Sequence, residues 1–273
     1  MITFSKLGKY GSIGNQMFQY ATLFSIGLKN NYEVKIPYIQ DYYHQDYQRN
    51  EYFFTKCFKN ISAKELTIDD KISLQRNITY NYPAKFSKEV MNIPDFSDIE
   101  GYFQSYKFFI DYKYEILKEF TFTNDLLMEA EIKYSNFINK YSCLHFRGGD
   151  YTWRQNYHPL MNLDYYKKAI ETINSNNYLV FSDDIKAIKD ILAPISKEIN
   201  FVFVENNHPF LDLALISLCK NHIIANSSFG WWGAFLNKNQ NNKVVAPKNW
   251  FGESMGKDNW EINDLIPSEW SLI

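Results

Sequence analysis

The stretch His145-Phe-Arg-Gly-Gly-Asp150 follows the apolar run 141–144, and Asn226-Ser-Ser-Phe-Gly-Trp-Trp-Gly-Ala234 follows a second such run, 222–225. Each run predicts a buried strand. Each stretch therefore places polar or charged groups where a strand ends, and in an open parallel α/β sheet that edge is where ligands bind. The first stretch offers a cation and a carboxylate, and the second offers hydroxyls and backbone N–H groups at the start of a predicted helix, which suit an anion. Together they predict a site for a phosphorylated ligand.

The composition is that of a globular protein of one or two domains. The chain has 273 residues, of which 45% are hydrophobic and 22% are charged. Its net charge is −2, and the Lys and Arg residues are scattered, so no electrostatic footprint for nucleic acid is present. The aromatic share of 18% is high. It is compatible with a carbohydrate ligand, and equally with Phe and Tyr filling the core.

Cysteine usage and hydropathy bear on the compartment. The three cysteines, Cys57, Cys143 and Cys219, are far apart and show no metal-ligand or redox spacing. We expect them to be free thiols in a reducing compartment, hence a cytoplasmic protein. No signal peptide and no apolar stretch long enough to span a bilayer are visible. A lipid-linked partner would then be reached from the inner face of the membrane.

The first half predicts one βαβ unit with a glycine-bearing turn. Residues 2–7 and 33–36 read as strands, with a helix over 15–28 between them. Gly8, Gly11 and Gly14 fall in the first turn, but their spacing is not that of the dinucleotide fingerprint. The turn either lets backbone N–H groups approach a ligand or is simply tight. The aromatic, unpatterned stretch 38–58 is expected to be a surface excursion that contacts substrate.

The second half alternates strands and helices more regularly, which predicts a parallel sheet. Strands are expected at 141–145, 178–181, 201–204, 222–225 and 243–246. Helices are expected at 163–174, 185–192, 210–220 and 230–236. We therefore place a first domain at 1–138 and a second at 139–273, with a final tail that packs back on the first.

Three predicted strand ends collect polar groups, and each has two interpretations. Arg147 can bind phosphate oxygens through a bidentate fork, or form a salt bridge with Asp150. Ser182-Asp-Asp184 can meet a base or ribose, or cap the following helix. His145 is either functional or a core histidine. Trp231 and Trp232 can either stack on a sugar or pack in the core.

Neither a metal site nor a nucleophile is indicated. The carboxylates Asp183 and Asp184 are adjacent rather than spaced as D-x-D, and His208 and His222 lack partners at ligand spacing. No Ser/His/Asp or Cys/His order stands out.

Five blocks of this chain resemble the α-1,2-fucosyltransferase family, glycosyltransferase family 11, and they occur in the family's order. They are Gly11-Ser-Ile-Gly-Asn-Gln-Met-Phe-Gln-Tyr-Ala21, Gly101-Tyr-Phe-Gln-Ser105, His145–Asp150, Phe181-Ser-Asp-Asp184 and Ile223-Ile-Ala-Asn-Ser-Ser-Phe-Gly-Trp-Trp-Gly-Ala234. They span nearly the whole chain, so the resemblance is specific.

The resemblance implies a GT-B fold, with two Rossmann-like domains facing a cleft and a parallel sheet in the C-terminal domain. It implies an inverting transfer of L-fucose from GDP-β-L-fucose to the 2-hydroxyl of a galactoside, without a metal. Arg147 would hold the diphosphate and stabilise the departing GDP, and Asp150 or His145 would deprotonate the acceptor. The implied donor-binding set is Gly14, Asn15, Gln16, Arg147, Ser182, Asp183, Asp184, Asn226, Ser227, Ser228 and Phe229. The acceptor would be a glycan, free or lipid-linked, read largely by the first half of the chain.

One departure from the family is Gly148, which stands where the family has a second arginine; Gly230 in place of serine is a smaller one. Loss of a charge-assisted contact is worth about 1.5–3 kcal/mol. Lys107 or Arg154 would have to supply the missing charge. The alternatives left open are a transferase for another GDP-sugar and a non-catalytic protein that binds a nucleotide or sugar.

Overall fold

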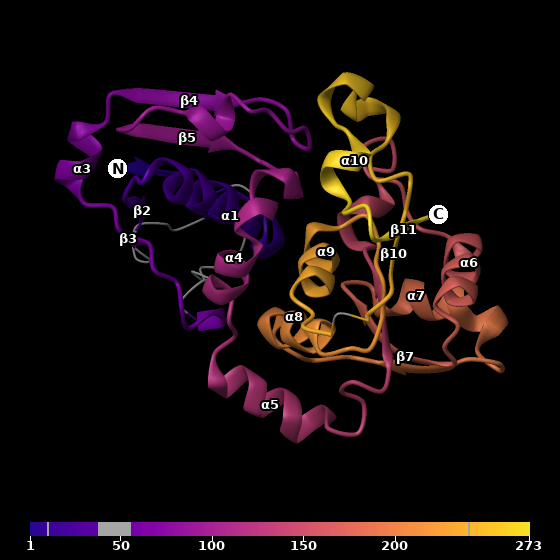
Figure 1. The fold of residues 1–273 in the computed structure, drawn as a ribbon. Coiled ribbons are helices and arrows are strands. Elements are labelled where there is room, and N and C mark those ends of the chain that lie inside the picture. Colours follow the sequence, from indigo (N-terminus) through magenta and orange to yellow (C-terminus); the bar gives the residue numbers. More distant parts are fainter. Residues whose placement is uncertain (10, 38–55, 240) are drawn as a thin grey trace. The chain divides into compact units, whose positions relative to one another are not determined.

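The chain forms two compact units in the computed structural model, which describes residues 1–9, 11–37, 56–239 and 241–273 (Figure 1). Unit 1 comprises Met1–Thr123 and Asp258–Pro267, and unit 2 comprises Asn124–Lys257 and Ser268–Ile273. The division thus falls earlier than the predicted 138/139 boundary, because helix α5 (Asn124–Tyr134) packs on helix α8 (Pro209–Ser217) of unit 2. Most of the predicted surface excursion, 38–55, lies outside the described residues.

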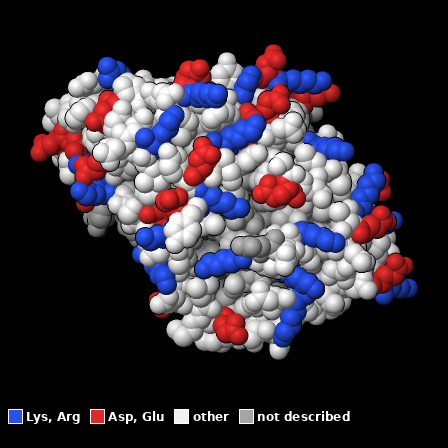
Figure 2. Space-filling model, in the orientation of Figure 1, with Lys and Arg blue, Asp and Glu red and all other residues white. Residues whose placement is uncertain are grey.

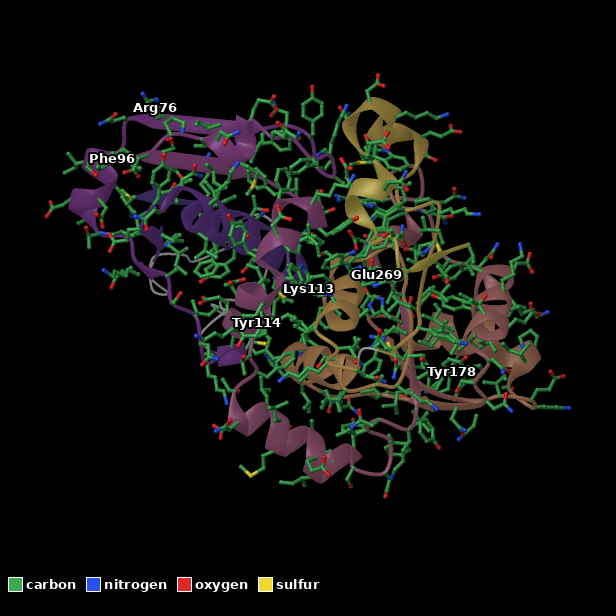
Figure 3. All side chains as sticks on the ribbon, viewed as in Figure 1. Arg76, Phe96, Lys113, Tyr114, Tyr178 and Glu269 are labelled. Atoms are coloured by element: carbon green, nitrogen blue, oxygen red, sulfur yellow. The ribbon has the colours of Figure 1, made fainter. Side chains whose placement is uncertain are left out.

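Unit 1 is built on a parallel sheet. In its described part the sheet has five strands in the order β3-β2-β1-β5-β4. The strands are β1 (Ile2–Thr3), β2 (Val34–Ile36), β3 (Lys64–Glu65), β4 (Arg76–Tyr80) and β5 (Ser97–Gly101). Arg76 and Phe96, at the beginnings of β4 and β5, lie at the same end of the sheet (Figure 3), as parallel pairing requires.

Helix α1 (Ile13–Asn30) contributes one nearly continuous buried segment to the unit 1 core. Met17, Phe18 and Ala21 are fully buried on it, and the ring of Phe18 packs against Phe109. The helix connects β1 to β2, so the predicted βαβ unit is confirmed. The first strand is shorter than predicted, because the backbone turns after Thr3 and Leu7 N–H donates to the Phe4 carbonyl at 3.0 Å.

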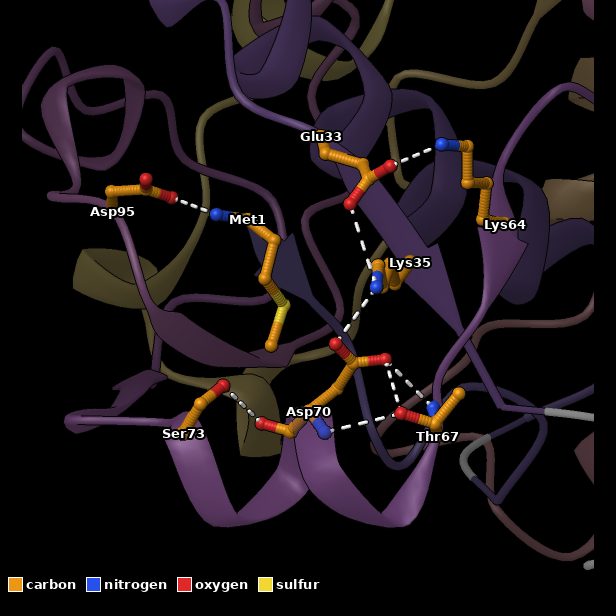
Figure 4. Close-up of polar contacts among 8 residues, drawn as sticks. All are labelled: Met1, Glu33, Lys35, Lys64, Thr67, Asp70, Ser73 and Asp95. Carbon is orange, nitrogen blue, oxygen red and sulfur yellow. Dashed lines mark hydrogen bonds and ion pairs between the residues drawn. The ribbon is translucent and has the colours of Figure 1, made fainter.

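The short helix α3 (Ile68–Ser73) begins with a capping box. Thr67 Oγ1 accepts from Asp70 N–H at 3.2 Å, and the Asp70 side chain accepts from Thr67 N–H at 2.9 Å (Figure 4). Asp70 also pairs with Lys35 of β2 at 2.7 Å, and Lys35 in turn lies 3.4 Å from Glu33. Asp69 and Asp70 thus stand in the first turn of this helix, with Asp70 as a capping residue.

The rest of unit 1 is helical and irregular. It includes α4 (Lys113–Glu119) and the 3-10 helices Val90–Asn92, Tyr106–Phe108 and Ile110–Tyr112. The tail segment adds α10 (Ile262–Leu265), and the Asp264 side chain accepts from Lys107 Nζ and from Phe86 N–H, both at 2.6 Å. Residues 258–267 are therefore anchored within unit 1.

Unit 2 holds a larger parallel sheet, of six strands in its described part, in the order β11-β10-β9-β6-β7-β8. The strands are β6 (Ser142–Phe146), β7 (Asn177–Ser182), β8 (Asn200–Phe203), β9 (His222–Ile223), β10 (Val244–Ala246) and β11 (Ser271–Leu272). The predicted parallel sheet is confirmed, whereas β3 and β11 were not predicted. The neighbours β6 and β7 pair along their whole length, ending at Phe146 opposite Ser182.

Helices cover both faces of the unit 2 sheet. One core cluster joins α6 (Leu163–Ile173) and α7 (Ile185–Leu192) to Leu144 and Phe146 of β6. The other joins α5 and α8 to Cys143, and α9 (Ser228–Phe235) packs against α8. Alternate residues of β6 thus face opposite layers, as strand geometry requires. The unit 2 3-10 helices are Gly149–Thr152, Ala193–Ile195 and Glu253–Met255, and Lys257–Asn259 spans the junction of the units.

The surface carries mixed charge. Lys and Arg side chains alternate with Asp and Glu on the face shown in Figure 2, in keeping with the scattered charge of the sequence. In the part of the chain that the structure describes, no helix is both long and apolar enough to cross a bilayer.

Candidate functional site

Arg147 lies at the carboxyl end of β6, held between two carboxylates. Its Nη2 is 2.7 Å from Asp150 Oδ1, and its Nη1 is 2.6 Å from Asp183 Oδ2 at the end of β7. The three side chains are between 30% and 37% exposed. The guanidinium also lies 5.4 Å from the centre of the Tyr151 ring. Because β6 and β7 are adjacent and parallel, their ends bring together two of the predicted polar clusters.

The backbone of Gly148 and Gly149, directly after Arg147, packs closely against the Asp183 carboxylate. Gly148 N–H donates to Asp183 Oδ1 at 2.8 Å, so this carboxylate binds the side chain of Arg147 and the backbone of its neighbour at once. Gly149 has a φ of +38°, and a Cβ there would lie 2.5 Å from Asp183 Oδ2. A side chain at position 149 would therefore displace the carboxylate that orients Arg147. Spacing alone did not single out Gly149.

Gly148 leaves no room for the arginine that the family has at this position. A Cβ there would lie 2.7 Å from Asp184 Cβ and 2.8 Å from Phe146 Cε1, closer than real Cβ contacts come. The two proposed substitutes have partners of their own. Lys107 belongs to unit 1 and pairs with Asp264, and the Arg154 guanidinium lies 4.4 Å from the Trp153 ring centre.

Ser182 and Asp184 cap the start of α7. Ser182 Oγ accepts from Asp184 N–H at 2.8 Å, and Asp184 Oδ1 accepts from Ala187 N–H at 3.0 Å. Ser182 and Asp184 thus make the capping bonds that the sequence allowed for this cluster. The remaining residue, Asp183, pairs with Arg147.

The second stretch joins β9 to α9. Asn226 is 2% exposed, and its Nδ2 donates to the carbonyls of Pro159 and Trp250, both at 3.0 Å. Ser227 Oγ accepts from Phe229 N–H at 3.3 Å and caps α9, whose first residue is Ser228. Trp231 and Trp232 are fully buried and serve packing. Asn226 therefore fixes two loops beside the start of the helix.

His145 lies in the core beneath the arginine. It is 5% exposed, and its ring centre lies 6.0 Å from that of Phe229. Burial, with a smaller contribution from the nearby Arg147 charge, lowers the pKa of His145 to about 3. Among the described residues its Nδ1 has no hydrogen-bond partner, and a Cβ at Gly230 would lie 2.8 Å from it. The histidine is therefore neutral near pH 7 and closely packed.

Tyr151 and His158 are site residues that the sequence reasoning missed. The Tyr151 hydroxyl donates to the Asn226 carbonyl at 3.1 Å, and its ring stacks on His158 with centres 4.6 Å apart. Burial raises the pKa of Tyr151 to about 12, and burial lowers the pKa of His158. Both are thus neutral near pH 7, and Tyr151 connects the first stretch to the second. The position of Tyr151 directly after Asp150 could have indicated from the sequence that it belongs to the site.

The unit 1 residues of the predicted donor set gather at the start of α1. Asn15 Oδ1 accepts from Gln104 Nε2 at 2.6 Å, so the first two family blocks meet within this unit. Gln16 Nε2 donates to the Gly11 carbonyl at 3.2 Å, and Gly14 is buried in the first helical turn.

No metal centre is present in the described residues: no group of three or more His, Cys, Asp and Glu side chains is placed to hold an ion. The three cysteines are free and buried.

Relatives with known names match nearly the whole chain. It is 29% identical over 298 residues to the O-antigen biosynthesis glycosyltransferase WbnK of Escherichia coli, covering 92% of this chain and 97% of that protein. It is 29% identical to an alpha-1,2-colitosyltransferase of E. coli, covering 96% of each. It is 25% identical to a galactoside 2-alpha-L-fucosyltransferase of Caenorhabditis elegans, covering 98% of this chain and 78% of that one.

Solved structures share the fold at low identity. POFUT1 in complex with GDP-fucose superposes with a TM-score of 0.56 at 12% identity, covering 90% of this chain and 97% of that one. The NodZ alpha-1,6-fucosyltransferase soaked with GDP-fucose gives 0.51 at 13%, covering 86% and 91%. The predicted GT-B type of fold, with two parallel sheets, is thus confirmed. The profile of "Glycosyl transferase family 11" matches residues 6–273, and the chain therefore belongs to this family of glycosyltransferases.

Proposed function

We propose that this glycosyltransferase moves L-fucose from GDP-fucose to the 2-hydroxyl of a galactoside in a surface glycan, with inversion at the sugar carbon. The observation that carries the proposal is Arg147, a half-buried guanidinium at the carboxyl end of β6. Support comes from the family and from relatives named galactoside 2-alpha-L-fucosyltransferase and alpha-1,2-colitosyltransferase. The GDP-fucose complex of a protein with the same fold is compatible with it.

In the proposed reaction the acceptor oxygen attacks C1 of fucose from the face opposite the phosphate. The bond between C1 and the phosphate oxygen breaks, and its electron pair leaves with GDP. Arg147 binds that diphosphate and stabilises the negative charge that develops on it, which is a major source of catalysis in such displacements. The fork of the guanidinium suits two phosphate oxygens at once. With Arg147 in this role, the proposal includes no metal.

We assign the proton acceptor to Asp150 rather than His145. The Asp150 side chain is 37% exposed and reaches Arg147, whereas His145 is 5% exposed with a pKa of about 3. A base must be accessible to the hydroxyl that it deprotonates, and this requirement favours the exposed carboxylate. His145 instead fills the layer beneath the site.

The remaining donor-binding residues are proposed to act around the nucleotide. Asp183 orients Arg147, Asp184 and Ser182 fix the start of α7, and Asn226 to Phe229 shape the start of α9. Gly14, Asn15 and Gln16 are proposed to contribute from unit 1.

A second donor is favoured by one specific observation. A relative at 29% identity is named for colitose rather than fucose. The alternative is therefore transfer of another GDP-linked sugar by the same residues.

Calorimetric titration with GDP, GDP-fucose and GDP-mannose, followed by transfer assays on a panel of galactosides, tests the proposal. We expect GDP and GDP-fucose to bind and fucose to be transferred. Absence of GDP binding would contradict both donors, and tighter binding of GDP-mannose than of GDP-fucose would favour another GDP-sugar. Binding of GDP-fucose without hydrolysis or transfer to any galactoside would favour a non-catalytic binding protein.

The variant Arg147→Ala should lower turnover at least about a hundredfold, because removal of one donor to developing negative charge typically costs about 2.7–4 kcal/mol. The matched control is Lys189→Ala, which removes a cation of the same unit that is paired with Glu205 on the surface. Near-normal turnover in Arg147→Ala would refute the role given to this residue. For Asp150→Asn we expect a lower kcat and GDP binding at least as strong as in the unaltered protein, because a carboxylate beside the guanidinium is removed; weaker GDP binding would instead make Asp150 a positioning residue for Arg147.

A further inference from the structure

Residues 152–158 line a hollow of about 610 Å³ in unit 2. The volume lies in the range of small-molecule sites. The segment that lines the hollow directly follows Asp150 and Tyr151 in the sequence, so its first residues lie near the proposed base. Three residues of chain span at most about 10 Å, which keeps Trp153 within reach of a ligand that also touches Asp150.

The backbone of this segment is held from several sides. Gly252 N–H donates to the Tyr157 carbonyl at 2.9 Å, and Ser254 N–H donates to the Asn156 carbonyl at 3.0 Å. A Cβ at Gly252 would lie 2.2 Å from the Asn156 carbonyl oxygen, so the two backbones touch. The segment is thus fixed to 252–254 at one end and, through the bond of Tyr151 to Asn226, to the start of α9 at the other.

Two aromatic side chains of the segment are left exposed. Trp153 is 68% exposed and Tyr157 is 49% exposed, although each is large and apolar enough to favour burial. The Arg154 guanidinium lies over the Trp153 ring at 4.4 Å, a cation–π contact that orients the indole. With one face so covered, the remaining indole surface is available to a ligand.

The polar groups beside these rings are neutral amides and one guanidinium. Gln155 Nε2 donates to the Thr152 carbonyl at 3.2 Å, which leaves its amide oxygen as an acceptor. Asn156 offers a second amide at the rim of the hollow. An exposed indole with amides and an arginine at its edge suits a pyranose, whose C–H face packs on an aromatic ring while its hydroxyls bind the polar groups.

We propose that residues 152–158 form the subsite for the terminal galactose of the acceptor, with Trp153 as the ring on which the sugar packs. This inference rests on the proposed function, because it supplies the acceptor to the same reaction. It shifts part of acceptor recognition to unit 2, whereas the sequence suggested that the first half of the chain reads most of the acceptor.

Saturation-transfer-difference NMR with lactose, in the presence of GDP, tests the subsite. We expect clear saturation of the galactose ring protons with the unaltered protein. It should fall at least about fivefold in Trp153→Ala and stay largely unchanged in Trp153→Phe, which keeps an aromatic face. The matched control is Ile132→Ala on α5, an apolar residue that is exposed to a similar extent (77%) on the helix that leads to the opposite, amino end of β6.

Titration with GDP alone separates this inference from the proposed function. If GDP binds but lactose is not saturated, or is saturated equally in Trp153→Ala, the subsite is wrong and the donor function stands. If Trp153→Ala weakens GDP binding tenfold or more, the indole packs on the nucleotide and the acceptor assignment is overturned. If GDP does not bind the unaltered protein, the proposed function itself fails.

Discussion

Arg147 and Asp183 form an ion pair, with 2.6 Å between Nη1 and Oδ2, and the same guanidinium bonds Asp150 at 2.7 Å. One cation thus faces two carboxylates. The cluster carries one net negative charge before any ligand arrives, although its proposed ligand is a diphosphate. Binding must therefore either displace a carboxylate from the guanidinium or tolerate its charge nearby, and this conflict leads to the first prediction.

Asp183→Asn should strengthen the binding of inorganic pyrophosphate and GDP about three- to tenfold at low salt. The amide oxygen can still accept from Gly148 N–H, but the negative charge beside the anion is removed. The expected gain is modest, ~0.7–1.4 kcal/mol, because the side chains are about one-third exposed and therefore screened. Isothermal titration at two salt concentrations measures it, and the gain should shrink at the higher one.

Asp184→Asn is the matched control for this charge. Asp184 is the adjacent carboxylate and caps α7, and asparagine is as good an N-cap as aspartate. We expect no change in stability and a smaller change in pyrophosphate affinity. Weaker GDP binding in Asp183→Asn would contradict the charge argument and would indicate that Asp183 contacts the nucleotide directly.

Gly148→Arg, which restores the family's residue, should lower the melting temperature and fail to raise turnover. The new Cβ would lie 2.7 Å from Asp184 Cβ and 2.8 Å from the Phe146 ring, and overpacking of this kind costs about 1–3 kcal/mol. Thermal unfolding and a transfer assay measure both effects.

A second substitution tests whether steric conflict is the cause. Asp184→Gly removes the nearer obstructing atom, and glycine costs only a few tenths of a kcal/mol at an N-cap. Gly148→Arg combined with Asp184→Gly should therefore recover part of the lost melting temperature. If Gly148→Arg alone is as stable as the unaltered protein and has a higher turnover, then steric conflict does not exclude an arginine at this position. The glycine would then simply deprive the site of a useful positive charge.

Unit 2 could be predicted well because its central strands β6, β9 and β10 are buried on both faces, whereas helices α6 and α7 are buried on one face only. Strands covered by helices read as continuous apolar runs, which set them apart from amphipathic helices. Helix α7 begins and ends where its pattern predicted, at Ile185 and Leu192. Strands β3 and β11 escaped prediction, because they are mostly exposed strands at the edges of their sheets and lie in no apolar run, whereas the equally short β1 and β9 are buried.

The candidate site was predictable in its location but not in its contacts. Both Arg147 and Asp183 follow predicted parallel strands, so the sequence predicted that they lie at the same edge of the sheet. They are close together because β6 and β7 are neighbours. The sequence could not show that Asp183 bonds a backbone N–H from 35 residues away, or that Asp184 occupies the space beside Gly148. For His145 the sequence left a catalytic and a core role open. Its alternation with Leu144 and Phe146 places it on the face with Cys143, where the fold buries it.

Transfer activity should persist in EDTA, because the proposal gives the stabilisation of the diphosphate to Arg147 rather than to a cation. Turnover of GDP-fucose with and without excess EDTA measures this directly. A complete loss of activity in EDTA that is reversed by Mg²⁺ or Mn²⁺ would refute the assignment. The variant Arg147→Lys gives a second measure: it keeps the charge but loses the bidentate fork, so we expect intermediate turnover.

Stability should fall as the pH drops below the ordinary range of histidine. His145 and His222 are buried, and burial lowers their pKa values to about 3 and about 4 from 6.5. Between pH 6.5 and these lowered pKa values, the unfolded chain binds protons that the folded chain does not. The free energy of unfolding therefore increases with pH in this window, and it decreases as the pH falls from 6.5 toward 4. Each histidine contributes up to roughly 1.4 kcal/mol per pH unit.

Asp212 acts in the opposite direction, and the two effects can be separated by substitution. Burial raises the pKa of Asp212 from 3.8 to about 6, so between these values the folded chain binds its proton and the unfolded chain does not. His145→Gln should therefore flatten the dependence of unfolding free energy on pH between 6 and 4.5, whereas Asp212→Asn should steepen it. Guanidinium unfolding at several pH values measures both slopes. An unchanged slope in His145→Gln would mean that His145 takes up its proton in the folded protein, which would reopen its candidacy as the base.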